Sequence, residues 1–446
     1  MQVGISRRGA LKLGAATAAL PLVHIRTAGA AGKLAIGFWD HWVPGANDVL
    51  TKIVKEWGEK NKVDTSIDYI TSVGNKNLLT LAAESQAKTG HDIQQFPTWE
   101  VRNNADNLES MTDVVKRLTA KYGPVNPIVD YLAKSKDDYK AMPSMTAGQY
   151  KGCASRIDSW KEQMGMDLQA IFPVGDKMGP GYDDWTWTKF LEAAPKMNKA
   201  GVPFGLPMGQ FTDAVDWVGS CFASFGAQLV DEKGEITVKS DNVRKVMEFF
   251  KKLMPELPGD VFSWDDASNN RALISGKSAL IFNPPSAWAV AVRDNPEIGK
   301  KVWHHPSPAG DKGRFTPYLP YFWGVWKFAQ NKTAAKELIE FLCEREQAER
   351  LVIASHGYDI PPFASMADFK VWQTEGPPPG TVANYPIRPP HNAKAWIAAY
   401  PAPPDIAVQI YNQATMTKMI ARMAQGGNSI EQAIDWAQGE LEGFTR

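Results

Sequence analysis

Aromatic side chains stand next to polar ones at several points of the sequence, most densely just after the first apolar run. In "GFWDHWVPGAN", residues 37–47, the consecutive residues are Trp39, Asp40, His41 and Trp42. Similar groupings follow: Trp99 with Glu100, Trp264 with Asp265, Asn283 with Trp288, and Tyr321 with Trp323. Aromatic faces stack on the C–H faces of sugars, while polar neighbours hydrogen-bond the hydroxyl groups. The groupings indicate binding of a polar solute, with interior packing as the competing interpretation for each ring.

Motifs for other chemistry are absent or incomplete. Gly276, Lys277 and Ser278 match the end of a phosphate-binding loop, but Arg271 stands where its first glycine belongs. The sequence has no G-x-S-x-G, H-E-x-x-H or C-x-x-C. His304 and His305 lie in an expected strand, where neighbours point to opposite faces. We therefore expect no catalytic residue, no metal site and no cofactor.

The first part of the chain alternates strands and helices. Strands are expected at 33–38, 64–70 and 92–96. A helix capped by Asn47 should bury one apolar face, and a second should span 77–90. This order predicts a parallel sheet covered by helices, with ligands at the carboxyl ends of the strands. Trp39 to Trp42 and Trp99-Glu100 should meet at that edge.

A second αβ region begins near Gln149. The expected strands and helices cover 150–155, 183–197, 241–253, 278–282 and 333–346. Between them the chain returns through 301–310 towards 321–329, and Tyr321 and Trp323 are expected in a loop after the return strand. A proline-rich tract, 375–391, is expected to be a surface loop. Two helices should close the chain, and Ser429 and Gln432 have the spacing of a capping box.

The first thirty residues read as a secretory signal. Arg7 and Arg8 in "SRRGALK" resemble a twin-arginine signal, and a small-residue site predicts cleavage near Ala30. Without that segment the chain has 45 basic and 49 acidic residues, which gives a formal charge of −4. This balance gives no reason to expect a nucleic-acid partner. We expect a soluble periplasmic protein in which Cys153, Cys221 and Cys343 are buried thiols.

The order of these motifs resembles the extracellular solute-binding proteins of ABC importers, family 1, the carbohydrate-binding, maltose-binding-protein-like group. "KLAIGFWDHW" followed by "NDVLTKIVKEWGEKN" resembles the opening strand, ligand loop and helix of that family. "WTWTKFLEAAPKM" is similar to its "TW-x-E-F" helix start, and "ALISGKSALIFNPPSAW" to its "F-x-x-GKAAM" segment with an "NGPW"-like end. "HPSPAGDKG" resembles the "P-x-P-G-x-x-G" return to the first lobe.

The resemblance implies a periplasmic binding protein-like α/β fold, with two αβ lobes, a hinge and a ligand cleft. The first lobe would comprise 31–147 and 302–355, and the second 148–301 and 356–446 with the C-terminal helices. The implied ligand-binding residues are Trp39, Asp40, His41, Trp42, Trp99, Glu100, Gln210, Asn283, Trp288, Tyr321 and Trp323. The protein would act as a monomer that delivers its solute to an inner-membrane ABC permease.

Three functions remain open at this point. A sugar or polyol carrier is favoured by the aromatic groupings. A binding protein of the same fold for a polyamine or organic anion is the second, although no cluster of Arg or Lys favours the anion. A secreted carbohydrate-active enzyme is the third; it needs a carboxylate pair, for which Asp40, Glu100 and Asp265 are the placed acids.

Overall fold

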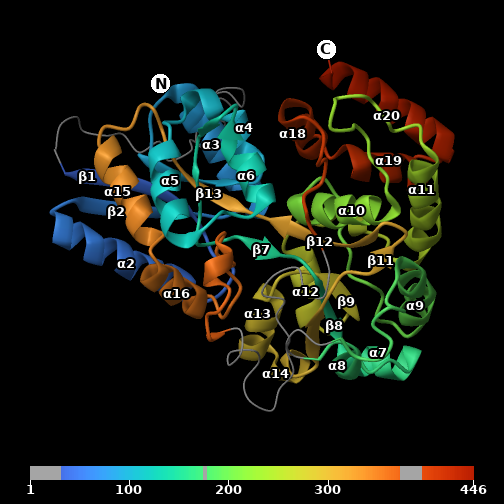
Figure 1. Cartoon of the computed structure of the whole chain (residues 1–446). Helices are drawn as coiled ribbons and strands as arrows, with labels where there is room; N and C mark the ends of the chain where they lie inside the picture. The colour runs from blue at the N-terminus through green and yellow to red at the C-terminus, as the bar shows by residue number, and fades with distance from the viewer. Residues whose placement is uncertain (1–31, 174–177, 372–393, 446) are drawn as a thin grey trace, which may run out of the picture.

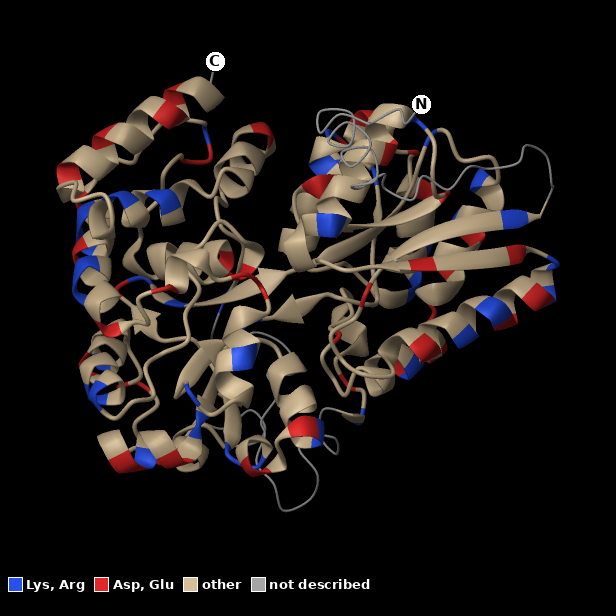
Figure 2. Ribbon diagram, turned by 180° about the vertical axis from the view of Figure 1, so that it is seen from behind, with Lys and Arg blue, Asp and Glu red and all other residues tan. Residues whose placement is uncertain are grey.

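The computed structural model describes residues 32–173, 178–371 and 394–445. Two αβ lobes lie side by side, joined by strands in the middle of the molecule (Figure 1). The predicted signal segment with its cleavage site near Ala30, and the proline-rich tract, lie outside the described residues. Charges of both signs are interspersed along the helices of both lobes (Figure 2).

The first lobe is built on a five-stranded sheet. Its strand order is β2 (Asp64–Ile70), β1 (Lys33–Trp39), β3 (Ile93–Pro97), β13 (Tyr321–Val325) and β6 (Met142–Pro143). β1 pairs in parallel with β2 and β3, as predicted, while β13 returns from late in the chain and runs antiparallel to β3. β1 is buried from Leu34 to Trp39 because strands flank it on both sides, whereas the edge strand β2 is only partly buried.

Helices cover the first sheet. They are α2 (Ala46–Asn61), α3 (Lys76–Ala87), α4 (Glu100–Asn103), α5 (Thr112–Tyr122), α6 (Pro127–Ala133), α15 (Lys332–Leu342) and α16 (Arg345–Ala354), with a small hairpin of β4 (Lys134–Ser135) and β5 (Asp138–Tyr139). α2 packs against α15 and α16 and buries the predicted apolar face. The cap prediction is wrong: Gly45, at φ 86°, caps α2, and the Asn47 side chain binds the preceding loop instead.

The second lobe contains a three-stranded sheet, in the order β10 (Val302–His305), β8 (Cys153–Arg156) and β9 (Leu280–Phe282). Its helices are α7 (Ile157–Met164), α8 (Leu168–Ile171), α9 (Trp187–Lys199), α10 (Thr212–Phe225), α11 (Asp241–Leu253), α12 (Ser268–Ile274), α13 (Ser286–Asp294), α14 (Pro296–Gly299), α18 (Pro404–Asn412), α19 (Thr415–Ala424) and α20 (Ile430–Phe444). Among the described residues after 400 there are three helices, where two were predicted. The predicted capping box of Ser429 and Gln432 is confirmed at the start of α20.

The helix α10 lies at the centre of the second lobe. It is buried from Asp213 to Ser224, so side chains on every face meet protein. Trp217 stacks on Phe282 of β9, with ring centroids 5.7 Å apart. A Cβ at Gly219 would lie 2.4 Å from the Cβ of Ala398, so glycine allows α10 to approach the chain after β14 (Lys394–Trp396). This packing fixes the first turn of α10 at the middle of the molecule.

Strands and loops cross between the lobes. β12 (Gly313–Leu319) pairs with β7 (Gln149–Tyr150), β11 (Ala309–Gly310) and β14, and it leads through Pro320 directly into β13 of the first sheet. The predicted strand 150–155 is divided into β7 and β8 by Lys151 and Gly152. A further contact joins the amide of Ile360 to the carbonyl of Gly148.

Two lobe boundaries differ from those predicted. The boundary at 302 assigned β10 to the first lobe, but β10 pairs with β8, with Trp303 opposite Ser155. The boundary at 356 assigned the following segment to the second lobe. Phe363 instead bridges to Val125, and the turn η5 (Ala364–Met366) packs on α5 of the first lobe.

Cys153, Cys221 and Cys343 are free, buried thiols, as predicted, and burial raises the pKa of each. Within the described ranges, no helix has the length and apolarity needed to cross a membrane. The same ranges hold no group of three or more His, Cys, Asp or Glu side chains arranged to bind a metal.

Candidate functional site

A cavity lies between the two lobes. Its lining residues come from both lobes and from the crossing segments: Trp39, Trp42, Ser72, Gln149, Lys151, Thr212, Asp213, Asp266, Asn270, Asn283, Pro284, Ser286, Leu319, Tyr321 and Tyr358. Its free volume is about 30 Å³, enough for water but far below the roughly 300–1,000 Å³ of small-molecule pockets. The lobes are therefore closed on each other, and a larger solute can enter only if they separate.

Aromatic rings form the first-lobe side of the cavity. Trp39, the last residue of β1, lies with its ring centroid 5.4 Å from that of Tyr321 and 6.2 Å from that of Tyr358. Its indole N–H points to the hydroxyl of Ser72, at 3.4 Å. Trp42 lines the same cavity and is partly exposed. Of the predicted residues, Trp39, Trp42 and Tyr321 thus meet at one place.

His41 supports this aromatic wall from behind. The amide of Val43 donates to Nδ1 of His41 at 2.9 Å, so Nε2 carries the proton and donates to Oδ1 of Asp359 at 3.1 Å. The imidazole lies 5.0 Å from Trp39 and 4.8 Å from Tyr358, between ring centroids. His41 is not among the residues that line the cavity, so its contacts position the rings.

An ion cluster occupies the opposite side. Nζ of Lys151 lies 2.6 Å from Oδ1 of Asp213 and 2.9 Å from Oδ2 of Asp216. The second oxygen of Asp213 accepts from Asn269 at 2.8 Å, and that of Asp216 accepts from Tyr411 at 2.8 Å. Burial lowers the pKa of Lys151, but the neighbouring carboxylates outweigh burial and raise it above its usual value. Lys151 is therefore charged.

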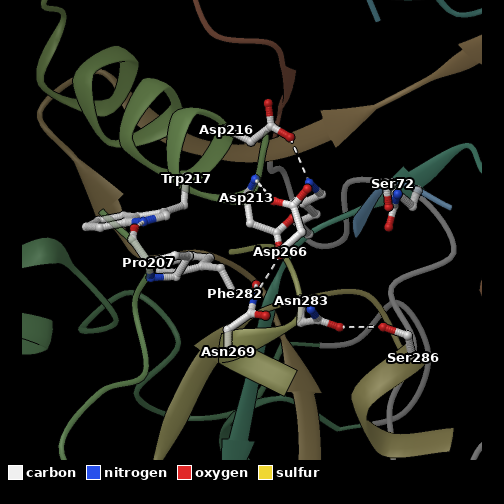
Figure 3. A network of polar contacts seen from close by, with 12 residues as sticks. Ser72, Pro207, Asp213, Asp216, Trp217, Asp266, Asn269, Phe282, Asn283 and Ser286 are labelled. Carbon is white, nitrogen blue, oxygen red and sulfur yellow. Dashed lines mark hydrogen bonds and ion pairs between the residues drawn. The ribbon is translucent and has the colours of Figure 1, made fainter. Parts of the chain in front are cut away.

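Asp266 is a third acid on the cavity (Figure 3). Its Oδ1 accepts the amide N–H of Asp213 at 3.1 Å. No residue in the described part of the chain binds its Oδ2. Burial, and then the charge of Asp213, raises the pKa of Asp266 to about 7. This carboxyl therefore exchanges its proton near neutral pH.

Amides of the second lobe complete the lining. Asn283 follows β9, and its amide donates to Oδ1 of Asn270 at 2.6 Å. Its own oxygen accepts from Ser286 at 2.8 Å (Figure 3). Asn283 is the fourth predicted residue that lines the cavity. The arrangement faces aromatic rings with carboxylates, amides and hydroxyls, which suits a solute that has both apolar faces and hydrogen-bonding groups.

Three predicted tryptophans pack in the interior instead of lining the cavity. Trp99 is fully buried and meets Tyr131 edge to face, at 5.5 Å between centroids. Tyr321 and Trp323 were both expected in a loop but lie in β13, where Trp323 packs 5.8 Å from Phe38 between ring centroids. Trp288 is buried within α13. For these rings the packing interpretation fits the structure.

Three predicted polar residues also lie off the cavity. Asp40 is exposed and accepts from Asn47 at 2.7 Å. Glu100 accepts from Asn103 at 2.8 Å and from Asn412 of the second lobe at 3.3 Å. Burial raises the pKa of Glu100. Gln210 is exposed, three residues before Asp213.

The sequence did not predict the ion cluster beside the cavity, which consists of Lys151, Asp213 and Asp216. Lys151 stands inside an expected buried strand, and Asp213 and Asp216 stand one turn apart in a helix that has no other charged residue. Charged side chains in such positions are rarely buried unless they are paired. That rule is the signal that could have identified Lys151 and these acids as partners.

The comparisons with known proteins agree with this architecture. The model of a family described as bacterial extracellular solute-binding protein matches residues 52–383. Maltose-bound MalE3 of T. maritima has 18% identity and a TM-score of 0.71, covering 92% of this chain and 99% of its own. The tagatose-bound ABC transporter solute-binding protein of Thermotoga lettingae TMO has 16% identity and a TM-score of 0.73, covering 93% and 100%.

A third solved structure, the ribitol complex of an ABC transporter solute-binding protein from Agrobacterium radiobacter K84, has 16% identity and a TM-score of 0.66, covering 92% and 98%. At these identities the likeness shows the fold, and the predicted two-lobe, binding-protein-like α/β fold is confirmed. No curated protein sequence matches the chain. The family model spans well over half of the chain, and the protein therefore belongs to the bacterial extracellular solute-binding protein family.

Proposed function

We propose that this protein is the periplasmic binding component of an ABC importer and that it holds a sugar or polyol between its lobes for delivery to an inner-membrane permease. The observation that carries the proposal is the cavity between the lobes, where Trp39, Trp42 and Tyr321 face Asn270, Asn283 and Ser286. Rings of this kind stack on the C–H faces of a sugar, and the polar groups bind its hydroxyls.

The closed cavity fits the working cycle of such a carrier. A solute enters between separated lobes, and its contacts with both lobes favour the closed form. β12, which continues through Pro320 into β13, and the chain between β6 and β7 are the crossings about which the lobes would turn. The exported location and the action as a monomer are parts of the same proposal, supported by the signal-like first thirty residues and by the family.

The charges of the cavity separate the alternatives. An organic anion is disfavoured because Lys151, which lines the cavity, is already paired with Asp213 and Asp216. A polyamine remains the second candidate because three carboxylates surround one ammonium. A glycoside-cleaving enzyme is disfavoured because it needs a pair of free carboxyl groups. Asp266 has a free oxygen, but both oxygens of Asp213, the other acid on the cavity, are engaged by Lys151 and Asn269.

The test measures ligand binding by the mature protein. Sugars, polyols, polyamines and organic acids are added in turn, and tryptophan fluorescence and thermal melting report which of them bind. A ligand at 100 times its dissociation constant stabilises the fold by about 2.7 kcal/mol. The proposal requires that at least one sugar or polyol gives this response. A response to polyamines or acids alone would overturn it, and turnover of a glycoside would favour the enzyme.

A further inference from the structure

The charges beside the cavity do not balance. Lys151 lies between Asp213 and Asp216, and Asp266 adds a third carboxyl group. In the part of the chain that the structure describes, Lys151 is the only lysine or arginine that lines the cavity. Three carboxylates against one ammonium leave a net charge of −2, or −1 when Asp266 is protonated. A buried negative charge without a partner is costly, so these charges favour a positively charged group in the cavity.

Polar atoms on the cavity remain available to a ligand, among them one oxygen of Asp266 and the hydroxyl of Tyr321. Asp213 and Asp216 use both of their oxygens within the protein. Across the described residues, neither Oδ2 of Asp266 nor the hydroxyl of Tyr321 has a partner. Tyr321 is only 5% exposed, and it lines the cavity. The Oδ2 atom of Asp266 can therefore accept a hydrogen bond from the solute, and the hydroxyl of Tyr321 can donate or accept one.

The aromatic wall adds to the preference for positive charge. Trp39, Tyr321 and Tyr358 line the same cavity as Asp266. The π face of each ring carries negative electrostatic potential and attracts an ammonium group. Rings and carboxylates therefore favour the same kind of group from opposite sides.

We propose that the solute carries a protonated amine in addition to hydroxyl groups, and that this ammonium binds Asp266 beside Tyr321 and the rest of the aromatic wall. The proposal rests on the proposed function, because it names the chemical class of solute for the same cavity. A neutral sugar could donate a hydroxyl proton to Asp266, but it would leave the excess negative charge of the cluster uncompensated. An amino sugar or amino polyol supplies both the hydroxyls and the missing charge.

The groups that face Asp266 support this assignment. From α10 they are Asp213 and Asp216, and from the segment after β7 there is Lys151, held by those two acids. From the first lobe, His41 directs its proton to Asp359 behind the rings. Because burial and the neighbouring Asp213 place the pKa of Asp266 at about 7, an arriving ammonium replaces a proton that is weakly held at neutral pH.

The experiment compares amines with their neutral parents by calorimetry on the mature protein at pH 7. The pairs are glucosamine with glucose and N-acetylglucosamine, galactosamine with galactose, glucamine with sorbitol, and chitosan dimer with cellobiose; spermidine is included as an amine without hydroxyls. We expect at least one hydroxylated amine to bind ten times more tightly than its parent. Its affinity should fall roughly tenfold from pH 7 to pH 5.5, as Asp266 becomes protonated.

The variant Asp266→Asn keeps the shape and removes the charge. It should cost the amine at least tenfold in affinity and change the neutral parent less than threefold. The matched control is Asp265→Asn, whose carboxylate binds Ser268 and Arg271 and does not line the cavity. The pH series uses the unaltered protein, so it decides the question even if Asp266→Asn folds poorly.

The outcomes separate this inference from the proposed function. A neutral sugar or polyol that binds as tightly as its amine, with no pH dependence, overturns the inference and leaves the proposed function standing. Binding of spermidine without any hydroxylated ligand overturns the proposed function and, with it, the hydroxylated amine. Failure of every compound in the panel counts against both.

Discussion

The ammonium of Lys151 lies 2.6 Å from Oδ1 of Asp213, although the two residues are 62 positions apart in the sequence. Lys151 stands on the chain between β7 and β8, where the polypeptide enters the second lobe, and Asp213 lies in the first turn of α10. The contact joins the crossing segment to the central helix of that lobe. It also keeps both side chains ordered at the edge of the cavity.

Replacing Lys151 by methionine should destabilise the protein by about 3–5 kcal/mol, because it leaves two buried carboxylates without their cation. Urea unfolding followed by circular dichroism measures this change. Lys189→Met is the control: its side chain is 34% exposed and paired with Glu192, so the loss should be about 0–1 kcal/mol at most. Equal effects of the two substitutions would contradict the buried ion cluster.

Replacing Asp359 by alanine should destabilise the protein by about 1–3 kcal/mol, because it removes the acceptor of both His41 Nε2 and the amide of Ala147. Affinity for the solute should fall too, since His41 packs on Trp39 and Tyr358. Thermal melting and calorimetry give the two values. The exposed Asp368→Ala should change neither; a melting temperature unaltered by Asp359→Ala would show that the pair does not hold the wall.

Replacing Trp42 by alanine should weaken solute binding about tenfold, or ~1.4 kcal/mol, while the melting temperature of the free protein stays close to that of the original. The reason is that Trp42 lines the cavity but is only partly buried. Trp436→Ala is the matched control, because Trp436 is a partly buried tryptophan on α20 that packs on Arg422. If both variants bind normally, the ring of Trp42 serves packing alone.

The stability of the ligand-free protein should depend on pH through Asp266. Its pKa is about 7 in the folded protein and near 3.8 in the unfolded chain. Between these values the folded state holds a proton that the unfolded state has lost, so the contribution of Asp266 falls as pH rises from about 4 to 8. Asp266→Asn should remove this fall. Urea midpoints at pH 5, 6, 7 and 8 for the variant and the original protein provide the measurement; parallel curves would contradict the raised pKa.

Elements whose signal is local were predictable from the sequence. β1 and α2 follow from an apolar run and from apolar residues three and four positions apart, and α11 covers the expected 241–253. The box of Ser429 and Gln432 depends on two residues three positions apart. The gathering of Trp39, Trp42, Asn283 and Tyr321 was also predictable, because each comes near the end of a strand.

Side-chain direction and long-range pairing could not be obtained in this way. Trp99 also follows a strand, yet its ring turns inward onto Tyr131 because the chain enters α4 at once. The partnership of Lys151 with Asp213 and Asp216 depends on how α10 packs against the crossing segment, which no local pattern records. The same limit explains why β10 was assigned to the wrong lobe. Its partner strand β8 lies far away in the sequence: the hydrogen-bonded residues Ser155 and His305 are 150 positions apart.

Leu319 and Tyr321 flank Pro320, on the stretch that leaves one sheet and enters the other, and both line the cavity. Residues that contact the solute and residues that set how readily the lobes part are therefore neighbours on a single peptide. Substitutions here would change both which solute binds and how long it stays bound. Asn283 and Ser286 lie within the second lobe, away from the crossing segment, so substitutions there would change the solute contacts alone. Attempts to redirect this protein to a new cargo, or to make it a biosensor, should begin with the second-lobe positions and leave this stretch intact.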